Sequence, residues 1–183
     1  KKVGKPIELA PRKFSKAIIL QKFLNPKTKE IEDYILFDST AKATIIFPLT
    51  QHKEVIAVRQ FRHGVNEIVL ELPGRCAKMP YDTPELVARN ELLEETGYEP
   101  NEIILLDREF FIDPASYTPR NRVVIALECR KIREQNLDNS EHIEVHLIPL
   151  SQWLDIASKK LVDYKSMAIT LAALPYIGVT LTL

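Results

Sequence analysis

DTPELVARNELLEETGY, residues 82–98, is the stretch that decides the fold, because it carries the start and stop signals of one helix. Thr83 can cap the first turn, and Pro84 suits the first helical position. Gly97 can end the helix in the left-handed conformation. Together these signals predict a helix over residues 84–96.

Three carboxylates within this helix, Glu91, Glu94 and Glu95, stand at i, i+3 and i+4. This spacing places them in one arc of the helix surface, where each like-charged pair costs roughly a few tenths of a kcal/mol. A bound cation or raised pKa values would relieve the repulsion. Carboxylate oxygens suit hard divalent ions, Mg²⁺ before Zn²⁺. A solvated acidic face is the competing interpretation.

Apolar residues flank the acidic arc on both sides. Leu86 and Leu93 lie on one side, and Ala88 and Leu92 lie on the other. Apolar stripes on both flanks are typical of a helix that packs against other elements. The pattern therefore predicts a helix buried in the fold, with an acidic edge open to a cleft.

The same stretch resembles the signature of the Nudix hydrolases, which reads Gly, five residues, Glu, seven residues, Arg-Glu-aliphatic-any-Glu-Glu-any-Gly-aliphatic. The second half matches at Glu91, Leu92, Glu94, Glu95, Gly97 and Tyr98. The first half departs from the pattern. Cys76 stands at the opening Gly, Asp82 at the first Glu and Asn90 at the Arg, with Arg89 one position away.

The departures concern a buried ion pair that, in the family, braces the loop before the helix. Here Asp82 and Asn90 replace both partners, and a shorter carboxylate can still share a hydrogen bond with a neutral amide. We therefore expect the helix to fold with a looser brace. An active hydrolase and a weakened or non-catalytic relative both remain open.

Neighbouring segments extend the resemblance to about residues 14–175. Residues 58–62 and 71–74 (VRQFR and ELPG) resemble the run before the signature in ADP-ribose pyrophosphatase-like members, and Pro114 lies close to a proline of those members. The resemblance implies Mg²⁺-dependent hydrolysis of the diphosphate bond of a nucleoside diphosphate sugar. ADP-ribose, giving AMP and ribose 5-phosphate, is the preferred substrate, and GDP-mannose is another.

The resemblance also implies a metal site and a base. Glu91, Glu94 and Glu95 would bind Mg²⁺, or Mn²⁺, together with the backbone carbonyl of Gly74. Such an ion neutralises diphosphate oxygens and lowers the pKa of an attacking water. Glu94 or Glu141 would accept the proton of that water.

Further residues are expected at the substrate. Arg62 matches an arginine that similar enzymes place against phosphate, and a planar guanidinium can hold two phosphate oxygens. Glu71 matches a position beside the active site, and Tyr117 lies in a loop that could contact a base or sugar. In the acidic loop that follows, Glu141 is the best match and Asp138 is its alternative. For Arg62, Glu71 and Glu141, an ordinary surface side chain is the competing interpretation.

Short runs with alternating or β-branched residues predict strands around this helix. They cover residues 16–24, 31–39, 43–48, 55–61, 67–72, 103–106, 109–112, 122–128 and 144–148. Two later helices are predicted at 151–158, capped by Ser151, and at 164–174, capped by Asp163 and stopped by Pro175. This order indicates an α/β (α+β) fold with a mixed sheet packed between helices.

The resemblance makes that fold an α/β/α sandwich over residues 46–183. Residues 1–45 would form an N-terminal antiparallel β extension, which builds a homodimer in similar pyrophosphatases. Within that extension, the basic residues 1–13 lack any period and are expected to form an irregular arm.

Composition narrows the possible partners and compartment. The 183 residues carry a formal net charge of zero, which argues against a nucleic-acid surface driven by bulk charge. Cys76 and Cys129 form no disulfide framework, and no N-terminal apolar run is present, so we expect a cytoplasmic protein. The uncharged residues 166–183 are interrupted by Pro175 and Gly178, which argues against a membrane span.

Two other hypotheses stand beside the enzyme. A Nudix fold that binds a nucleotide sugar without cutting it would tolerate the changes at Cys76, Asp82 and Asn90. A structural or partner-binding protein would need no ion at its acidic helix. Hydrolysis of a nucleotide sugar would indicate the enzyme, and binding without hydrolysis would indicate the binding protein. Neither binding nor hydrolysis would indicate the structural or partner-binding protein.

Overall fold

The computed structural model describes residues 1–13, 15–76, 82–139 and 141–180. The chain divides into two compact units. The first comprises Lys1–Lys42 and Phe110–Asn121, and the second comprises Ala43–Glu109 and Arg122–Leu183.

The first unit contains an antiparallel sheet in the order β1-β2-β3. Its strands are β1 (Lys2–Glu8), β2 (Lys16–Leu24) and β3 (Ile31–Ser39), and the last two have the predicted bounds. The irregular arm expected over residues 1–13 was wrong, because β1 pairs with β2 from Lys2 to Glu8. Nearly all side chains of this edge strand are exposed, so backbone pairing holds it without the alternation that would reveal a strand.

Residues 110–121 join this first unit, which no sequence pattern predicted. The short strand β10 (Phe110–Phe111) pairs with the start of β11 (Arg120–Lys131). Backbone bonds run from Phe37 N to Ser116 O at 2.8 Å and from Thr118 N to Phe37 O at 2.9 Å. The rings of Phe37 and Tyr117 stack with centroids 4.9 Å apart.

The second unit is built on a mixed sheet with β11, β4, β5 and β12 as neighbours in that order. β11 runs parallel to β4, whereas β4–β5 and β5–β12 are antiparallel. The strands are β4 (Ala43–Thr50), β5 (Glu54–Arg62), β6 (Glu67–Glu71), β7 (Gly74–Cys76), β8 (Tyr98–Glu99), β9 (Glu102–Leu105), β11 and β12 (Ile143–Pro149). The mixed sheet confirms the predicted fold class.

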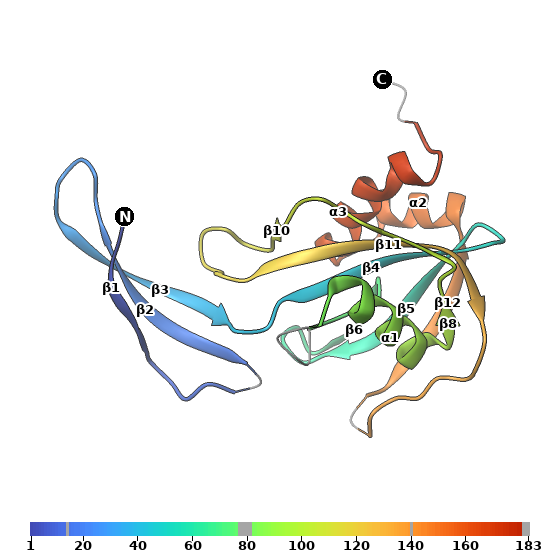
Figure 1. The fold of residues 1–183 in the computed structure, drawn as a ribbon, viewed down its shortest axis with the longest axis horizontal. Helices are drawn as coiled ribbons and strands as arrows, with labels where there is room; N and C mark the ends of the chain where they lie inside the picture. Colours follow the sequence, from blue (N-terminus) through green and yellow to red (C-terminus); the bar gives the residue numbers. More distant parts are fainter. Residues whose placement is uncertain (14, 77–81, 140, 181–183) are drawn as a thin grey trace. The chain divides into compact units, whose positions relative to one another are not determined.

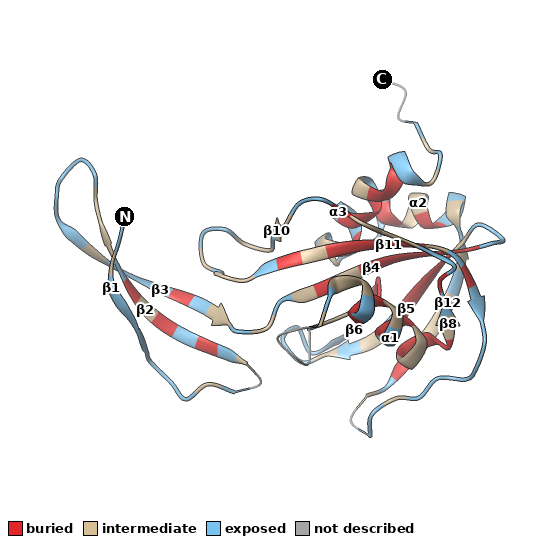
Figure 2. Cartoon of the chain, viewed as in Figure 1, coloured by how far each residue is buried: buried red, intermediate tan, exposed pale blue. Residues whose placement is uncertain are grey.

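Helices cover both faces of this sheet. Figure 1 shows α1 (Pro84–Thr96) on one face, and α2 (Leu150–Lys159) with α3 (Tyr164–Ala173) on the other. Ala88 and Leu92 of α1 pack against Ile46, Ile56 and Val124 of the sheet. Figure 2 shows the buried residues running along β4, β5 and β11, the strands between the two helical layers.

The second helical layer contacts the core through Trp153, whose side chain is fully buried. Its indole Nε1 donates to Thr170 Oγ1 of α3 at 2.8 Å, so the two helices share a buried hydrogen bond. Ser166 Oγ of α3 accepts from Leu72 N at 2.8 Å, which ties the helix to the segment after β6.

The ends of the later helices differ partly from expectation. Ser151 does not cap α2, because the helix already begins at Leu150, directly after Pro149, and has no side-chain cap. Asp163 does cap α3 and accepts from Ser166 N at 3.1 Å. Pro175 lies inside a 3₁₀ turn, η1 (Leu174–Tyr176), that continues from α3. In the described part of the chain, no helix has the length and apolar character needed to cross a membrane.

Candidate functional site

The signature helix α1 forms as its end signals predict. Thr83 Oγ1 accepts from Leu86 N at 3.2 Å, and Gly97 takes a left-handed φ of +79°. A Cβ at Gly97 would lie 2.1 Å from the carbonyl oxygen of Arg133. Glycine is therefore required there both for its conformation and for the chain that passes next to it.

The three carboxylates of α1, here called the acidic rim (Glu91, Glu94 and Glu95), are not equally accessible. Glu91 and Glu95 are 3% and 4% exposed, whereas the side chain of Glu94 is 34% exposed. The expected acidic edge open to a cleft is thus found at Glu91 and Glu94, which line a small pocket, whereas Glu95 is buried. The i, i+4 spacing of Glu91 and Glu95 places them together on the face that α1 turns toward the protein interior.

Burial of this pair holds a proton in the site. Burial raises the pKa of Glu95 to about 9, and the charge of Glu91 and a hydrogen bond with it act in the same direction. Burial also raises the pKa of Glu91, although Arg75 opposes that rise. Among the described residues, the buried Oε2 of Glu95 has no hydrogen-bond partner. The pair therefore has one buried carboxyl oxygen that no described residue contacts by a hydrogen bond.

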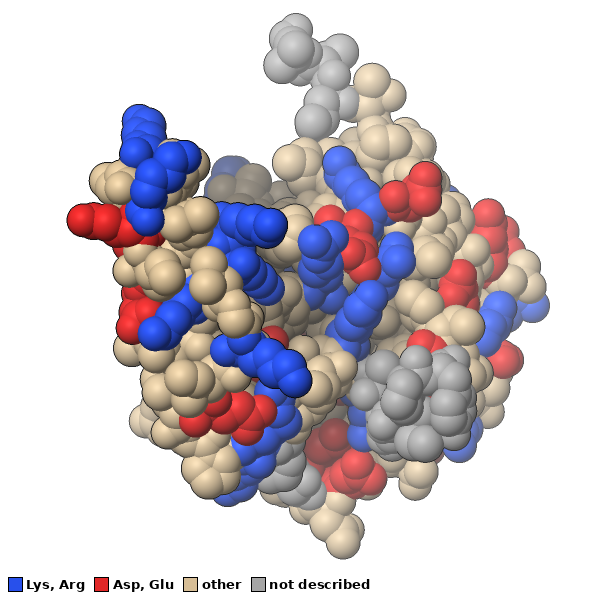
Figure 3. All heavy atoms as spheres, turned by 60° about the vertical axis from the view of Figure 1, so that its left-hand side comes forward, with Lys and Arg blue, Asp and Glu red and all other residues tan. Residues whose placement is uncertain are grey.

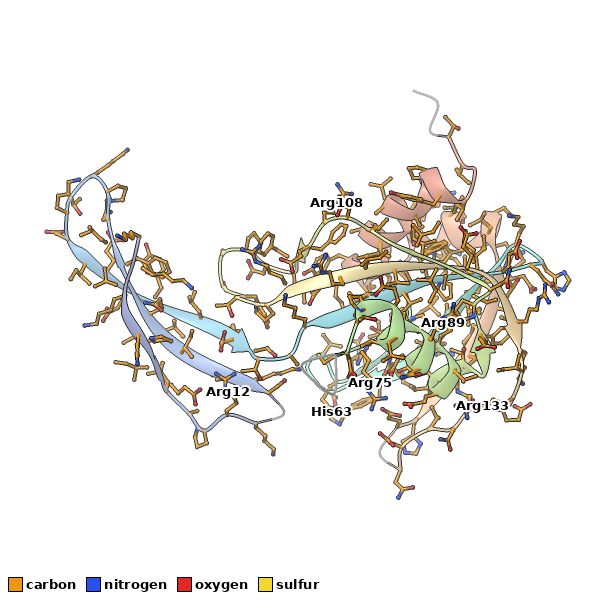
Figure 4. All side chains as sticks on the ribbon, viewed as in Figure 1. Arg12, His63, Arg75, Arg89, Arg108 and Arg133 are labelled. Carbon is orange, nitrogen blue, oxygen red and sulfur yellow. The ribbon has the colours of Figure 1, made fainter. Side chains whose placement is uncertain are left out.

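Arg75 is a cation that contacts the rim, and no sequence pattern indicated it. Its Nη1 donates to Glu91 Oε2 at 2.9 Å and to Glu94 Oε2 at 2.7 Å. Its Nη2 reaches Asp138 Oδ2 at 3.4 Å. Figure 4 shows Arg75 beside α1. The sequence feature that could have indicated such a cation is the cluster of three carboxylates, which a nearby positive charge stabilises.

The departures in the first half of the signature meet at the same place. Asp82 and Asn90 line a small pocket of about 50 Å³ together with Arg75, Glu91 and Glu94. Arg89, one position from the expected arginine, instead donates to the carbonyl of Pro100 at 2.9 Å. Thus Arg75, from β7, brings a guanidinium to the side of α1 where Asn90 supplies none.

The acidic loop lies against the C-terminal end of α1. Gln135 Nε2 donates to the carbonyls of Glu95 at 2.6 Å and Ile143 at 3.1 Å, and Asn136 N donates to Glu94 O at 2.9 Å. Glu141 sits in this loop, and its charge contributes to the raised pKa of Glu95. The structure therefore brings Glu141 near the rim, although its use as a base stays a prediction.

Arg62 and Glu71 form a second polar cluster on neighbouring strands. Arg62 Nε donates to Glu71 Oε1 at 2.6 Å, and Lys165 Nζ of α3 lies 4.0 Å from Glu71 Oε2. Glu71 is 2% exposed, so it is not the surface residue of the competing interpretation. The positive charge of Arg62 also lowers the pKa of Glu95, against its burial, so this cluster and the rim share one electrostatic environment.

Gly74 and Tyr117 have different surroundings. A Cβ at Gly74 would lie 2.8 Å from Thr44 O, so glycine permits the close pairing of β7 with β4. Its carbonyl as a metal ligand stays a prediction. Tyr117 belongs to the first unit, where it lines a pocket of about 540 Å³ with Phe23, Tyr34 and Arg120. Its contact with substrate also stays a prediction.

The donor set of the rim fits a hard divalent cation by its chemistry. It offers carboxylate oxygens one helical turn apart and one buried oxygen with no partner among the described residues. As arranged, however, the described acidic, histidine and cysteine side chains form no group of three ready to hold a metal. Glu91 and Glu94 turn toward Arg75, so an ion would have to redirect them.

Comparisons with known proteins cover the part of the chain that contains α1. The model of the NUDIX domain family matches residues 39–168. The chain is 29% identical over 127 residues to an ADP-ribose pyrophosphatase of Bacillus subtilis, covering 68% of this chain and 67% of that protein. It is 32% identical over 128 residues to a GDP-mannose pyrophosphatase of Escherichia coli K12, covering 66% of each. The chain thus spans about two thirds of the length of these relatives.

A solved structure described as an ADP compounds hydrolase is similar across almost the whole chain. It superposes with a TM-score of 0.78 over 97% of each chain at 16% sequence identity. At that identity the likeness shows a shared fold. It covers both the N-terminal antiparallel sheet and the mixed sheet with its helices.

Proposed function

The chain belongs to the NUDIX family, and from this premise we propose that it hydrolyses the diphosphate bond of a nucleoside diphosphate sugar. ADP-ribose is the first substrate to test, with AMP and ribose 5-phosphate as products, and GDP-mannose is the second. The observation that carries the proposal is the acidic rim, in which Glu91 and Glu95 are buried side by side with an unused carboxylate oxygen. Relatives at about 30% identity act on both kinds of substrate by their names.

Glu91, Glu94 and Glu95 would hold Mg²⁺ or Mn²⁺ in this proposal, with Gly74 O as a further ligand. When bound, such an ion neutralises diphosphate oxygens and lowers the pKa of a water. Buried carboxylates favour ion binding because their repulsion is expensive where water is scarce. The proton on the pair of Glu91 and Glu95 must leave before both carboxylates can serve as ligands.

Proton transfer falls to a carboxylate outside the buried pair. Glu94 is the more accessible member of the rim, and Glu141 lies in the loop held against it. Either residue could accept the proton of the attacking water, because each carries a carboxylate at or near the rim. Rate measurements on Glu94→Gln and Glu141→Gln at saturating Mg²⁺ compare the two, because loss of the base slows the reaction even when the ion is bound.

Arg62 would bind the substrate phosphates. Its Nε is used by Glu71, and this contact fixes the plane of the guanidinium while 43% of the side chain stays exposed. A planar guanidinium held in this way can meet two phosphate oxygens at once. Glu71 then orients Arg62 rather than touching the substrate.

The first unit would supply the dimer contact. Its sheet carries large apolar side chains that are exposed in a single chain, among them Ile7, Ile31, Ile35 and Phe37. Apolar surface of this kind is typical of a protein interface. A second copy of the chain is the proposed partner that covers this surface. Equilibrium sedimentation of the wild-type protein and of Ile35→Lys tests whether the homodimer forms and whether it depends on this surface.

Other partners and the compartment remain sequence-based proposals. Figure 3 shows that the face it draws carries both basic and acidic side chains, and the formal net charge of the chain is zero. Neither a nucleic acid nor a membrane is therefore a proposed partner. Cys76 and Cys129 are free thiols, which agrees with the proposed cytoplasmic location.

A nucleotide-sugar sensor is the second candidate function. The observation that favours it is Arg75, which occupies two rim carboxylates that an active site needs for its ion. A panel of nucleotide sugars with Mg²⁺, followed by chromatography of the nucleoside monophosphates, tests the enzyme. Calorimetric binding of ADP-ribose without release of AMP would instead establish the sensor, and neither signal with any sugar nucleotide would reject both.

A further inference from the structure

Arg75 competes directly with any ion for the acidic rim. One atom, Nη1, donates to Oε2 of Glu91 and to Oε2 of Glu94. These are two of the three carboxylates proposed as ligands. The side chain of Arg75 is only 20% exposed, so its charge is weakly screened by water.

The backbone of β7 directs Arg75 to this position. Arg75 pairs with Thr44 of β4, and Gly74 and Cys76 pair with Ile45 and Ala43 on either side. The closeness of Gly74 to Thr44 O leaves no room for a side chain there. Because neighbouring residues of a strand point to opposite faces, this pairing fixes the face from which the Arg75 guanidinium reaches α1.

Ion and guanidinium cannot use the same two oxygens at once. A divalent ion that binds Glu91 and Glu94 must displace Nη1, so the free energy of the Arg75 contacts is subtracted from that of ion binding. Hydrogen bonds between charged groups are stronger than those between neutral groups. Asp138 Oδ2, 3.4 Å from Nη2, offers a second acceptor toward which the displaced guanidinium can move.

We propose that Arg75 is a resident counter-cation that sets the affinity of the acidic rim for divalent ions. It stabilises the ion-free protein and lowers the affinity for Mg²⁺ or Mn²⁺. This inference rests on the metal site of the proposed function, but it concerns ion binding and not turnover. Arg75 acts here as a positioning residue for the rim carboxylates.

Calorimetric titration with Mn²⁺ and thermal unfolding in EDTA test the proposal. Arg75→Gln is expected to bind Mn²⁺ about tenfold more tightly than the wild type, to melt lower in EDTA and to gain more from Mn²⁺. Arg75→Lys should restore the lower ion affinity, because it keeps the charge. Arg133→Gln, which changes an exposed arginine beyond the other end of α1, should behave as the wild type.

A purely structural Arg75 would lower the melting temperature without tightening ion binding, and that result would overturn the proposal. Absence of Mn²⁺ binding in both wild type and Arg75→Gln would overturn it too. Wild-type protein that binds Mn²⁺ less tightly than Arg75→Gln, yet releases no nucleoside monophosphate, would support it while rejecting the proposed hydrolysis.

A second measurement avoids dependence on the stability of Arg75→Gln. In the ¹⁵N spectrum of the wild-type protein, the guanidinium signal that is missing in Arg75→Lys belongs to Arg75. We expect this signal to shift when Mg²⁺ is added, as the contacts with Glu91 and Glu94 are lost. An unchanged signal at an ion concentration that saturates the protein would overturn the proposal.

Discussion

Arg62 Nε donates to Glu71 Oε1 at 2.6 Å, and it is Glu71 that is buried while Arg62 reaches solvent. The two residues should therefore tolerate loss of the partner unequally. Arg62→Met removes the short ion pair of a buried carboxylate, which keeps the longer contact of 4.0 Å with Lys165, and should cost about 3 kcal/mol of unfolding free energy. Glu71→Gln leaves an arginine that water can solvate and should cost about 1 kcal/mol. Urea unfolding measures the loss of unfolding free energy in both variants. Equal losses would show that the buried carboxylate of Glu71 does not need the charge of Arg62.

Glu95 should make the ion-free protein less stable as pH rises. Its pKa is about 9 when folded, against an ordinary value of 4.5, so the folded state binds the extra proton between these values. The stabilising effect is complete below the ordinary value and is lost as pH rises through the folded one. Melting temperatures in EDTA from pH 5 to 9 should fall in the wild type and fall less in Glu95→Gln. A parallel decline in both proteins would contradict the assignment.

Gly97→Ala should be far more damaging than Gly178→Ala. Both glycines have a positive φ, +79° and +74°, so both substitutions carry conformational strain of about 1 kcal/mol. Only at Gly97 would the added Cβ meet another group, the carbonyl of Arg133 at 2.1 Å. We expect Gly97→Ala to cost about 3 kcal/mol or more in urea unfolding. Similar losses of unfolding free energy at the two positions would show that the backbone at Arg133 can move away from the added Cβ at little cost.

Asp38 should support the first unit at neutral pH and lose this effect in acid. Burial alone would raise its pKa, but hydrogen bonds from Thr118 and Arg12 outweigh burial and lower it. A lowered carboxyl pKa contributes stability above its ordinary value of 3.8, and this is lost as pH falls through the folded value. Hydrogen exchange of β3 amides at pH 6 and pH 3 should show the loss in the wild type. Asp38→Asn should show little further change, and an equal pH response would contradict the argument.

The sequence predicted best where local signals and burial agree. The caps Thr83 and Gly97 place the ends of α1, and the runs with alternating or β-branched residues at 16–24 and 31–39 place β2 and β3. The edge strand β1 was missed because its side chains have no buried face to produce a pattern. Pairing with β2, not its own residues, makes it a strand.

The site was predictable on α1 and not beyond it. Helical spacing correctly grouped Glu91, Glu94 and Glu95, but spacing alone cannot say which of them faces the interior. Arg75 stands 16 residues before Glu91, and the two meet only because β7 pairs with β4 beside α1. A partner brought in by sheet pairing leaves no periodic signal in the sequence.

The most direct test of the central claim, that the acidic rim drives hydrolysis of a nucleotide sugar, compares Glu95→Gln with Glu99→Gln. Glu99 is an exposed carboxylate four residues beyond Glu95 and serves as the matched control. With Mg²⁺ and ADP-ribose or GDP-mannose, the wild type and Glu99→Gln should release nucleoside monophosphate at equal rates, and Glu95→Gln at least about a hundredfold more slowly. Equal release by all three proteins, or no release by the wild type, would contradict the account.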